Sequence, residues 1–189
     1  MNKRKPKNCP ICKKSFEPLQ SMQRVCGPSC ALTFNREKDT ANRVKADRAR
    51  TRERKRALMT LSDHHKQTQA IFNKYIRLRD QKRGLPCISC QRHHTGQYHA
   101  GHYRSVGANP ELRYLEDNCW RQCSVCNNHL SSNAINFRIN LVKLIGLERV
   151  EELEGPHDPL QLRIDDLIAI KAKYAEKVKQ LKKEINQAL

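Results

Sequence analysis

Two Cys-x2-Cys pairs in the middle of the chain constrain its fold more than any other feature. Thirty-two residues separate the last cysteine of one pair from the first cysteine of the other. Four thiolates in this pattern match a tetrahedral structural zinc site, with each sulfur about 2.3 Å from the metal. The ion would fix both ends of a segment that is too polar to build its own core. The four predicted ligands are Cys87, Cys90, Cys123 and Cys126.

A second set of four cysteines lies near the N-terminus, with 13 residues between its two pairs. A finger this short cannot bury enough apolar area to fold alone, so its metal would supply the folding free energy. The alternative is a redox pair or four unrelated thiols. The ligands predicted for this second zinc are Cys9, Cys12, Cys26 and Cys30.

The charge balance indicates a polyanionic partner. The 189 residues carry a formal net charge of +18, a mean hydropathy of −0.83 and only 5% aromatic side chains. Such an excess most often serves nucleic acid, and membrane-surface binding is the weaker alternative. No apolar run is long enough to span a bilayer, and the basic N-terminus lacks the apolar core of a secretion signal. We therefore expect a cytoplasmic protein without a membrane partner, whose cysteines bind metal rather than form disulfides.

Residues 29–83 contain neither proline nor glycine, and residues 36–56 carry ten Lys or Arg against four Asp or Glu. This composition favours a helix, but without an apolar stripe the helix has no face with which to pack on a core. We expect an exposed basic helix that contacts phosphates. The alternative is a solvated helix or a disordered linker. The predicted DNA contacts in this arm are Arg43, Arg48, Arg50, Arg52, Arg54 and Lys55.

The elements predict a small, zinc-stabilised α+β protein in three parts. Residues 1–30 would form a basic tail and zinc finger, residues 31–61 the basic arm, and residues 62–189 the core with flanking helices. Within the core we expect a helix starting at an N-cap near 62–63, a strand over 97–103 and a second strand within 104–116. Helices should follow from about 133 and over about 165–185.

Three polar residues have a defined spacing around the central cysteines. His102 lies between the pairs, Asn118 lies five residues before Cys123, and Asn127 directly follows Cys126. This arrangement resembles the HNH (ββα-metal) nuclease motif in a zinc-stapled, treble-clef-like form. The segments 84–90, 100–103 and 122–127 extend the likeness, and most of the chain is similar to the phage recombination nuclease family called NinG or Rap.

The resemblance implies a metal-dependent endonuclease that cuts branched recombination intermediates, such as Holliday junctions and D-loops. His102 would be the general base, Asn118 would tie the loop after the first strand, and Asn127 would bind a catalytic Mg²⁺ or Mn²⁺. Many relatives carry a metal ligand directly before the catalytic histidine, where this chain has Gly101. The substitutes are His99 and His129.

Several alternatives stay open at this level. The central zinc module could be purely structural, which would make the chain a non-catalytic zinc-finger protein that binds nucleic acid, or an HNH nuclease could act on linear or nicked duplex. Arg104 and Arg113 would contact phosphate beside the site or be solvated. A homodimer and other recombination proteins also fit as partners, in the cytoplasm of a bacterial host if the gene belongs to a phage.

Overall fold

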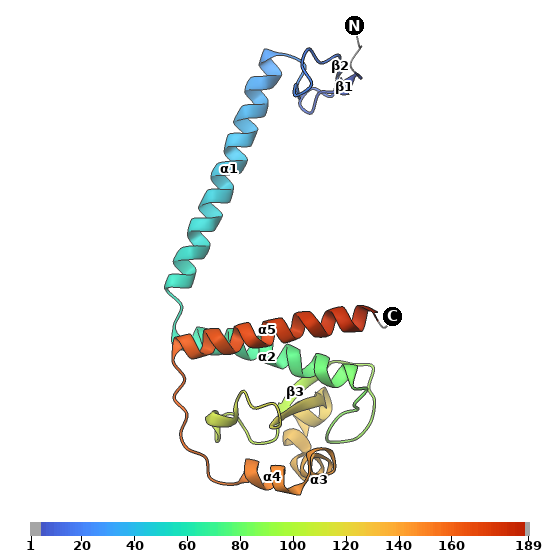
Figure 1. The fold of residues 1–189 in the computed structure, drawn as a ribbon, viewed down its shortest axis with the longest axis vertical. Coiled ribbons are helices and arrows are strands. Elements are labelled where there is room, and N and C mark those ends of the chain that lie inside the picture. Colours follow the sequence, from blue (N-terminus) through green and yellow to red (C-terminus); the bar gives the residue numbers. More distant parts are fainter. Residues whose placement is uncertain (1–4, 188–189) are drawn as a thin grey trace. The chain divides into compact units, whose positions relative to one another are not determined.

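The computed structural model describes residues 5–187, which form a mixed α+β protein that is mostly helical with two small sheets. The chain divides into two compact units, one up to Met59 and one from Thr60 onward (Figure 1). Within the described residues, none of the helices has the length and apolar content needed to cross a bilayer.

The first unit is a cysteine-rich knuckle joined to a long helix. Strand β1 (Lys7–Asn8) pairs antiparallel with β2 (Ser15–Phe16), and helix α1 (Pro28–Ala57) follows. Leu19 and Met22 are 84% and 88% exposed, so the knuckle has little apolar core. The helix begins earlier than the expected arm, because Pro28 is suited to a first helical turn. Cys30 therefore lies inside α1, so the predicted zinc finger and the predicted basic arm share one helix.

The second unit begins with helix α2 (Leu61–Lys82), whose start differs from the expected N-cap at 62–63. Thr60 is the N-cap, because its hydroxyl accepts a hydrogen bond from the Asp63 N–H while the Asp63 carboxylate accepts one from the Thr60 N–H. This reciprocal capping box satisfies two N–H groups of the helix start. Helix α5 (Ile164–Gln187) packs along α2 (Figure 1). Their interface buries Phe72, Ile76 and Tyr174.

A two-stranded hairpin packs against α2. Strand β3 (Tyr98–His102) pairs antiparallel with β4 (Cys119–Cys123), with Tyr98 opposite Cys123 and His102 opposite Cys119. The expected second strand within 104–116 is wrong, since those residues form a loop with a short 3₁₀ turn, η1 (Pro110–Leu112). Four of the five β4 residues are buried, so the strand lacks the polar alternation that marks a half-buried strand.

The chain after β4 is irregular before it becomes helical. A π-helical turn, η2 (Val125–His129), leads into a 3₁₀ turn, η3 (Ser131–Asn133), in which all three residues have positive φ. Helix α3 (Ala134–Ile145) and helix α4 (Leu147–Glu154) follow. They form a second apolar cluster with β4, through Trp120, Phe137 and Leu141.

The α2–α5 interface generates a stability prediction. Phe72 is fully buried, with its ring centroid 4.8 Å from Tyr174 and 5.7 Å from Tyr114. Phe72→Ala should lower the free energy of unfolding of this unit by about 3–5 kcal/mol, because it leaves a cavity. Urea denaturation followed by the fluorescence of Trp120, the single tryptophan, measures it.

Ile139→Ala is the matched control, because Ile139 is 48% exposed. It should change the free energy of unfolding by no more than about 0.5 kcal/mol. A loss below about 1 kcal/mol in Phe72→Ala would contradict the packing of α5 on α2.

Candidate functional site

The structure brings the eight predicted zinc ligands together in two tetrads. In each tetrad the sulfur atoms all lie within 4.8 Å of one another. A tetrahedral zinc with sulfurs at about 2.3 Å requires sulfur–sulfur separations of about 3.8 Å. In the N-terminal tetrad Cys26 Sγ lies 3.5 Å from Cys12 Sγ and 3.6 Å from Cys30 Sγ. Both tetrads could therefore hold a zinc ion.

The surroundings of the central tetrad suit thiolates. The Cys123 N–H donates to Cys87 Sγ at 3.3 Å, and Asn133 Nδ2 donates to Cys126 Sγ at 3.7 Å. Donors of this kind stabilise the negative charge of metal-bound sulfur. The ninth cysteine, Cys119, belongs to neither tetrad. Burial raises the pKa of its thiol, which therefore stays protonated and inert.

The side chain of His102 is half-buried beneath the loop that joins the two strands. Its Nε2 lies 3.0 Å from the backbone oxygen of Arg113. A carbonyl oxygen only accepts hydrogen bonds, so Nε2 carries the proton and Nδ1 is the basic atom of the neutral ring. Burial lowers the pKa of His102 more than the carbonyl contact raises it. The ring is therefore neutral at pH 7.

His102 lines a pocket of about 670 Å³ on the α2 side of the hairpin, together with Arg113 and His65. The guanidinium of Arg113 contributes Nη1, which lies 3.0 Å from His65 Nδ1. Asn127, His99 and His129 are not among the residues that line this pocket. The pocket therefore contains the predicted base, His102, and one predicted phosphate contact, Arg113. The ligands predicted for the catalytic cation lie outside it.

Asn118 clamps the loop between β3 and β4. Its side chain is fully buried, and Oδ1 accepts a hydrogen bond from the Arg104 N–H at 2.7 Å. Its Nδ2 donates to the carbonyl oxygens of Arg104 at 3.0 Å and Leu112 at 3.1 Å. One carboxamide therefore fixes two distant points of the loop that carries the Arg113 carbonyl.

The other face of the hairpin holds two buried polar atoms without hydrogen-bond partners. His99 and Gln122 are directly opposite each other, so their side chains share the face of Gly101. His99 Nε2 and Gln122 Oε1 are both buried and unpartnered within residues 5–187. Gln122 Nε2 donates to Ser89 Oγ at 2.6 Å and to the Ser132 carbonyl at 2.5 Å, which fixes the amide orientation.

Gly101 and Gln122 are sterically linked. A Cβ built at Gly101 would lie 2.1 Å from Gln122 Oε1, so the amide fills the space that a side chain at position 101 would take. Sequence reasoning missed Gln122. Its position directly before Cys123 gives no sign of a role, because the strand register that aligns it with His99 is a tertiary property.

The remaining predicted residues are exposed or half-buried. Asn127 and His129 lie in the π-turn η2, where Asn127 Nδ2 donates to Asn128 Oδ1 at 2.6 Å. Arg104 and Arg113 each have a buried Nε without a partner. The six predicted DNA contacts of α1 are all exposed, and within residues 5–187 none of them forms a salt bridge: Arg43, Arg48, Arg50, Arg52, Arg54 and Lys55.

Comparisons with known proteins establish the family. The family model described as "Bacteriophage Lambda NinG protein" matches residues 1–184. The chain belongs to the NinG family. The protein ninG of Escherichia phage 933W is 38% identical over 196 residues, which cover 96% of each chain. The ninG proteins of Escherichia phage lambda and Salmonella phage P22 are 37% and 36% identical, each over 94% of this chain and 93% of the relative. No solved structure matches the chain.

The family result confirms the NinG resemblance read from the sequence. The relatives are proteins of bacteriophages, and the match spans both units of the chain rather than the central motif alone. The knuckle, the basic helix α1 and the hairpin unit are therefore parts of one NinG architecture.

The two tetrads predict two zinc ions per chain. Cys126→Ser should lose one and unfold the hairpin, and Cys12→Ser should lose the other, because three thiolates bind zinc more weakly than four. Metal content of protein purified without chelators, measured by plasma mass spectrometry, reports the stoichiometry. Cys119→Ala is the matched control and should retain both ions. Zinc-free wild-type protein would disprove the assignment.

Proposed function

We propose that this NinG-family chain is a metal-dependent DNA endonuclease of the HNH type that cuts branched recombination intermediates, including Holliday junctions and D-loops. One observation carries the proposal. A neutral imidazole at the end of β3, His102, is held by a backbone carbonyl in an open pocket beside Arg113. The hairpin that carries it is closed by a cysteine tetrad suited to zinc.

His102 acts as the general base. Its Nε2 is engaged by the Arg113 carbonyl, and its Nδ1 lies 3.8 Å from the sulfur of the buried Cys119. Nδ1 is the basic atom, and it would accept a proton from a water molecule in place of this thiol contact. A lowered pKa keeps the ring neutral and ready to accept that proton. Asn118 is a positioning residue, because its hydrogen bonds hold the loop that supplies the carbonyl. Arg113 in the same pocket offers a guanidinium to the phosphate.

The chain's donors for a divalent cation lie on the opposite face of the hairpin. His99 Nε2 and Gln122 Oε1 are buried, unpartnered and on one face, as ligand atoms awaiting an ion would be. Asn127 and His129 in η2 are the further candidates. Mg²⁺ or Mn²⁺ would neutralise phosphate charge and stabilise the leaving oxygen, and an imidazole nitrogen favours Mn²⁺. For the base and the cation to act on one phosphate, the scissile strand would have to lie along β3, the strand that carries both His102 and His99.

The basic helix α1 supplies affinity for DNA. Its exposed cations have no acidic partner in the described chain, so phosphates would neutralise them and release counterions. Such contacts position a protein without reading sequence. Preference for branched DNA follows from the family likeness. A homodimer and other recombination proteins are proposed partners on the same ground.

A non-catalytic zinc-finger protein that binds nucleic acid is the second candidate. The observation that favours it is the separation of His102 from Asn127, which is absent from the lining of the His102 pocket. An HNH nuclease that acts on linear or nicked duplex is the third.

A nicking assay separates the three candidates. Wild-type protein with Mg²⁺ or Mn²⁺ should cut a synthetic four-way junction faster than matched linear and nicked duplexes. His102→Ala should lower the cutting rate by about 10²–10⁴-fold, because general-base catalysis contributes that much, and leave junction affinity unchanged. The acidic limb of the kcat/KM profile should lie below pH 6.5, since the base works neutral and its pKa is lowered.

His93→Ala is the matched control, because this exposed histidine of the same unit lies outside the pocket. It should cut at the wild-type rate. Absence of cutting by wild type on all three substrates with both metals would leave the zinc-finger protein as the function. Equal rates on all three would remove the branch preference.

The proposed ligands of the divalent cation predict a loss of Mn²⁺ affinity that can be measured without an assay of DNA cutting. Gln122→Leu should weaken Mn²⁺ binding by about 10–100-fold, because the amide oxygen is lost while the side-chain volume is nearly kept. Electron paramagnetic resonance of free Mn²⁺ measures the affinity, with Gln97→Leu, the same change at an exposed glutamine, as the control. Both variants should retain two zinc ions. Unchanged Mn²⁺ affinity in Gln122→Leu would exclude Gln122 as a ligand.

A further inference from the structure

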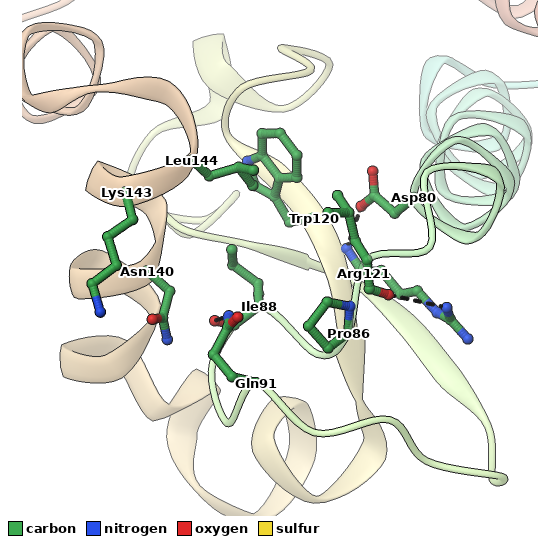
Figure 2. A pocket seen from close by; sticks show the side chains of 10 residues that line it. Asp80, Pro86, Ile88, Gln91, Trp120, Arg121, Asn140, Lys143 and Leu144 are labelled. Atoms are coloured by element: carbon green, nitrogen blue, oxygen red, sulfur yellow. Dashed lines mark hydrogen bonds between the residues drawn. The ribbon is translucent and has the colours of Figure 1, made fainter.

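A second pocket, of about 130 Å³, lies apart from the His102 site, between the turn at residues 85–91, β4 and helix α3. Figure 2 shows Lys143 and Asn140 reaching it from α3, Pro86 and Arg121 on the opposite side, and Ile88 between them. None of these residues has a role in the proposed base or cation sites. The pocket is far smaller than the roughly 300–1,000 Å³ that drug-sized ligands require, so it suits a single ring group.

The interior of the pocket is apolar and rigid. Trp120, Ile88 and Leu144 line it, and the first two are nearly fully buried members of the α3–α4 cluster. The indole Nε1 of Trp120 donates to the Asp117 carbonyl at 2.7 Å, and the guanidinium of Arg79 stacks 4.3 Å from the ring centroid. Trp120 is thus fixed without help from any ligand, and the part of its ring that lines the pocket is immobile.

The rim of the pocket offers two amide oxygens as acceptors. Asn140 Nδ2 donates to the Ser89 carbonyl at 3.1 Å, and Gln91 Nε2 donates to the Ile88 carbonyl at 2.8 Å. Because carbonyl oxygens only accept, both amides are held with their nitrogens toward the backbone. Within residues 5–187 no protein donor reaches Asn140 Oδ1 or Gln91 Oε1, which remain free to accept from a ligand.

The rim also carries an unneutralised cation. Lys143 is exposed, and it forms no salt bridge within the described part of the chain. The pocket therefore combines an apolar floor for a flat ring, two acceptors for N–H groups at the ring edge and an ammonium for a nearby anion.

We propose that this pocket binds one unpaired nucleobase of a DNA strand that bears an exocyclic amino group, namely adenine, cytosine or guanine. An exocyclic amino group satisfies the two amide oxygens, the ring rests against the apolar floor, and Lys143 contacts the adjoining phosphate. A paired base would have to leave its stack to enter, so the pocket selects DNA whose bases are already unpaired, as at a branch or bulge. The inference rests on the proposed DNA partner and deepens the choice of substrate, but it does not require cutting.

The test compares short duplexes that differ only at one bulged position, by fluorescence anisotropy with full-length, zinc-loaded protein and no added Mg²⁺ or Mn²⁺. An adenine bulge should bind about tenfold more tightly than a bulged abasic site, in line with the contribution of one stacked base. Thymine, which lacks the amino group, should fall between the two.

Leu144→Trp fills the pocket and should erase the difference between the adenine and abasic bulges without weakening binding of the abasic one. Ile139→Trp is the matched control, since Ile139 is an exposed residue of the same helix, and it should keep the difference. If Leu144→Trp fails to fold, as shown by its zinc content, Asn140→Leu takes its place. That variant should abolish the preference for adenine over thymine.

Equal affinity of wild-type protein for the adenine and abasic bulges would overturn the proposal. So would a preference that survives both Leu144→Trp and Asn140→Leu. Cutting of junctions measured in parallel separates the two proposals, because a nuclease without base preference refutes only the pocket. A base preference without cutting refutes only the nuclease.

Discussion

The second unit, from Thr60 onward, contains the β3–β4 hairpin and is called the hairpin unit here. Its fold depends on a link between metal binding and the register of the two strands. Cys123 is both a member of the central tetrad and the last residue of β4, directly opposite Tyr98. A zinc ion that joins Cys123 to Cys87 would therefore hold β4 at one position relative to the chain before β3. A slip of one residue would exchange the two faces of a strand. A slip of β3 would turn His102 toward the face of Gln122 and His99 toward α2, and would bury the wrong set of groups.

The Asn118 clamp fixes the opposite end of the same hairpin. The loop of residues 103–118 is too polar to be held by apolar packing alone, although Leu112 anchors it in the α3–α4 cluster. One buried carboxamide satisfies a backbone N–H and two carbonyls that would otherwise be orphaned. The imidazole of His102 then meets a carbonyl from residue 113 because the loop folds back, and not because the two residues are near in sequence.

Local chemistry explains which features the sequence could predict. The tetrads were predictable because cysteine number and spacing reflect metal coordination directly, and the helices α2 and α5 because their apolar faces repeat at helical spacing. The position of strand β4 was predicted wrongly because the strand is buried on both faces, so its sequence lacks an alternation of apolar and polar residues. The positive φ values at Ser131, Ser132 and Asn133 could not be predicted, because none of these residues is a glycine. Gln122 acquires its meaning only from the register with His99, and the small pocket only from the approach of α3 to β4.

Arginine has two different roles in this protein, one in the folded core and one on the exposed helix α1. In the hairpin unit Arg79 is mostly buried and serves cohesion, since its Nε bonds the Asp80 carboxylate at 2.7 Å and its Nη2 the Cys119 carbonyl at 3.0 Å. The arginines of α1 have no such partners, and repulsion among them opposes the helix that carries them. A polyanion would remove that repulsion and gain contacts at once, so DNA binding and the order of α1 should be coupled. Helix α1, with ten Lys or Arg against four Asp or Glu, contributes +6 of the net charge of +18, and this part of the charge stabilises a complex rather than the folded chain.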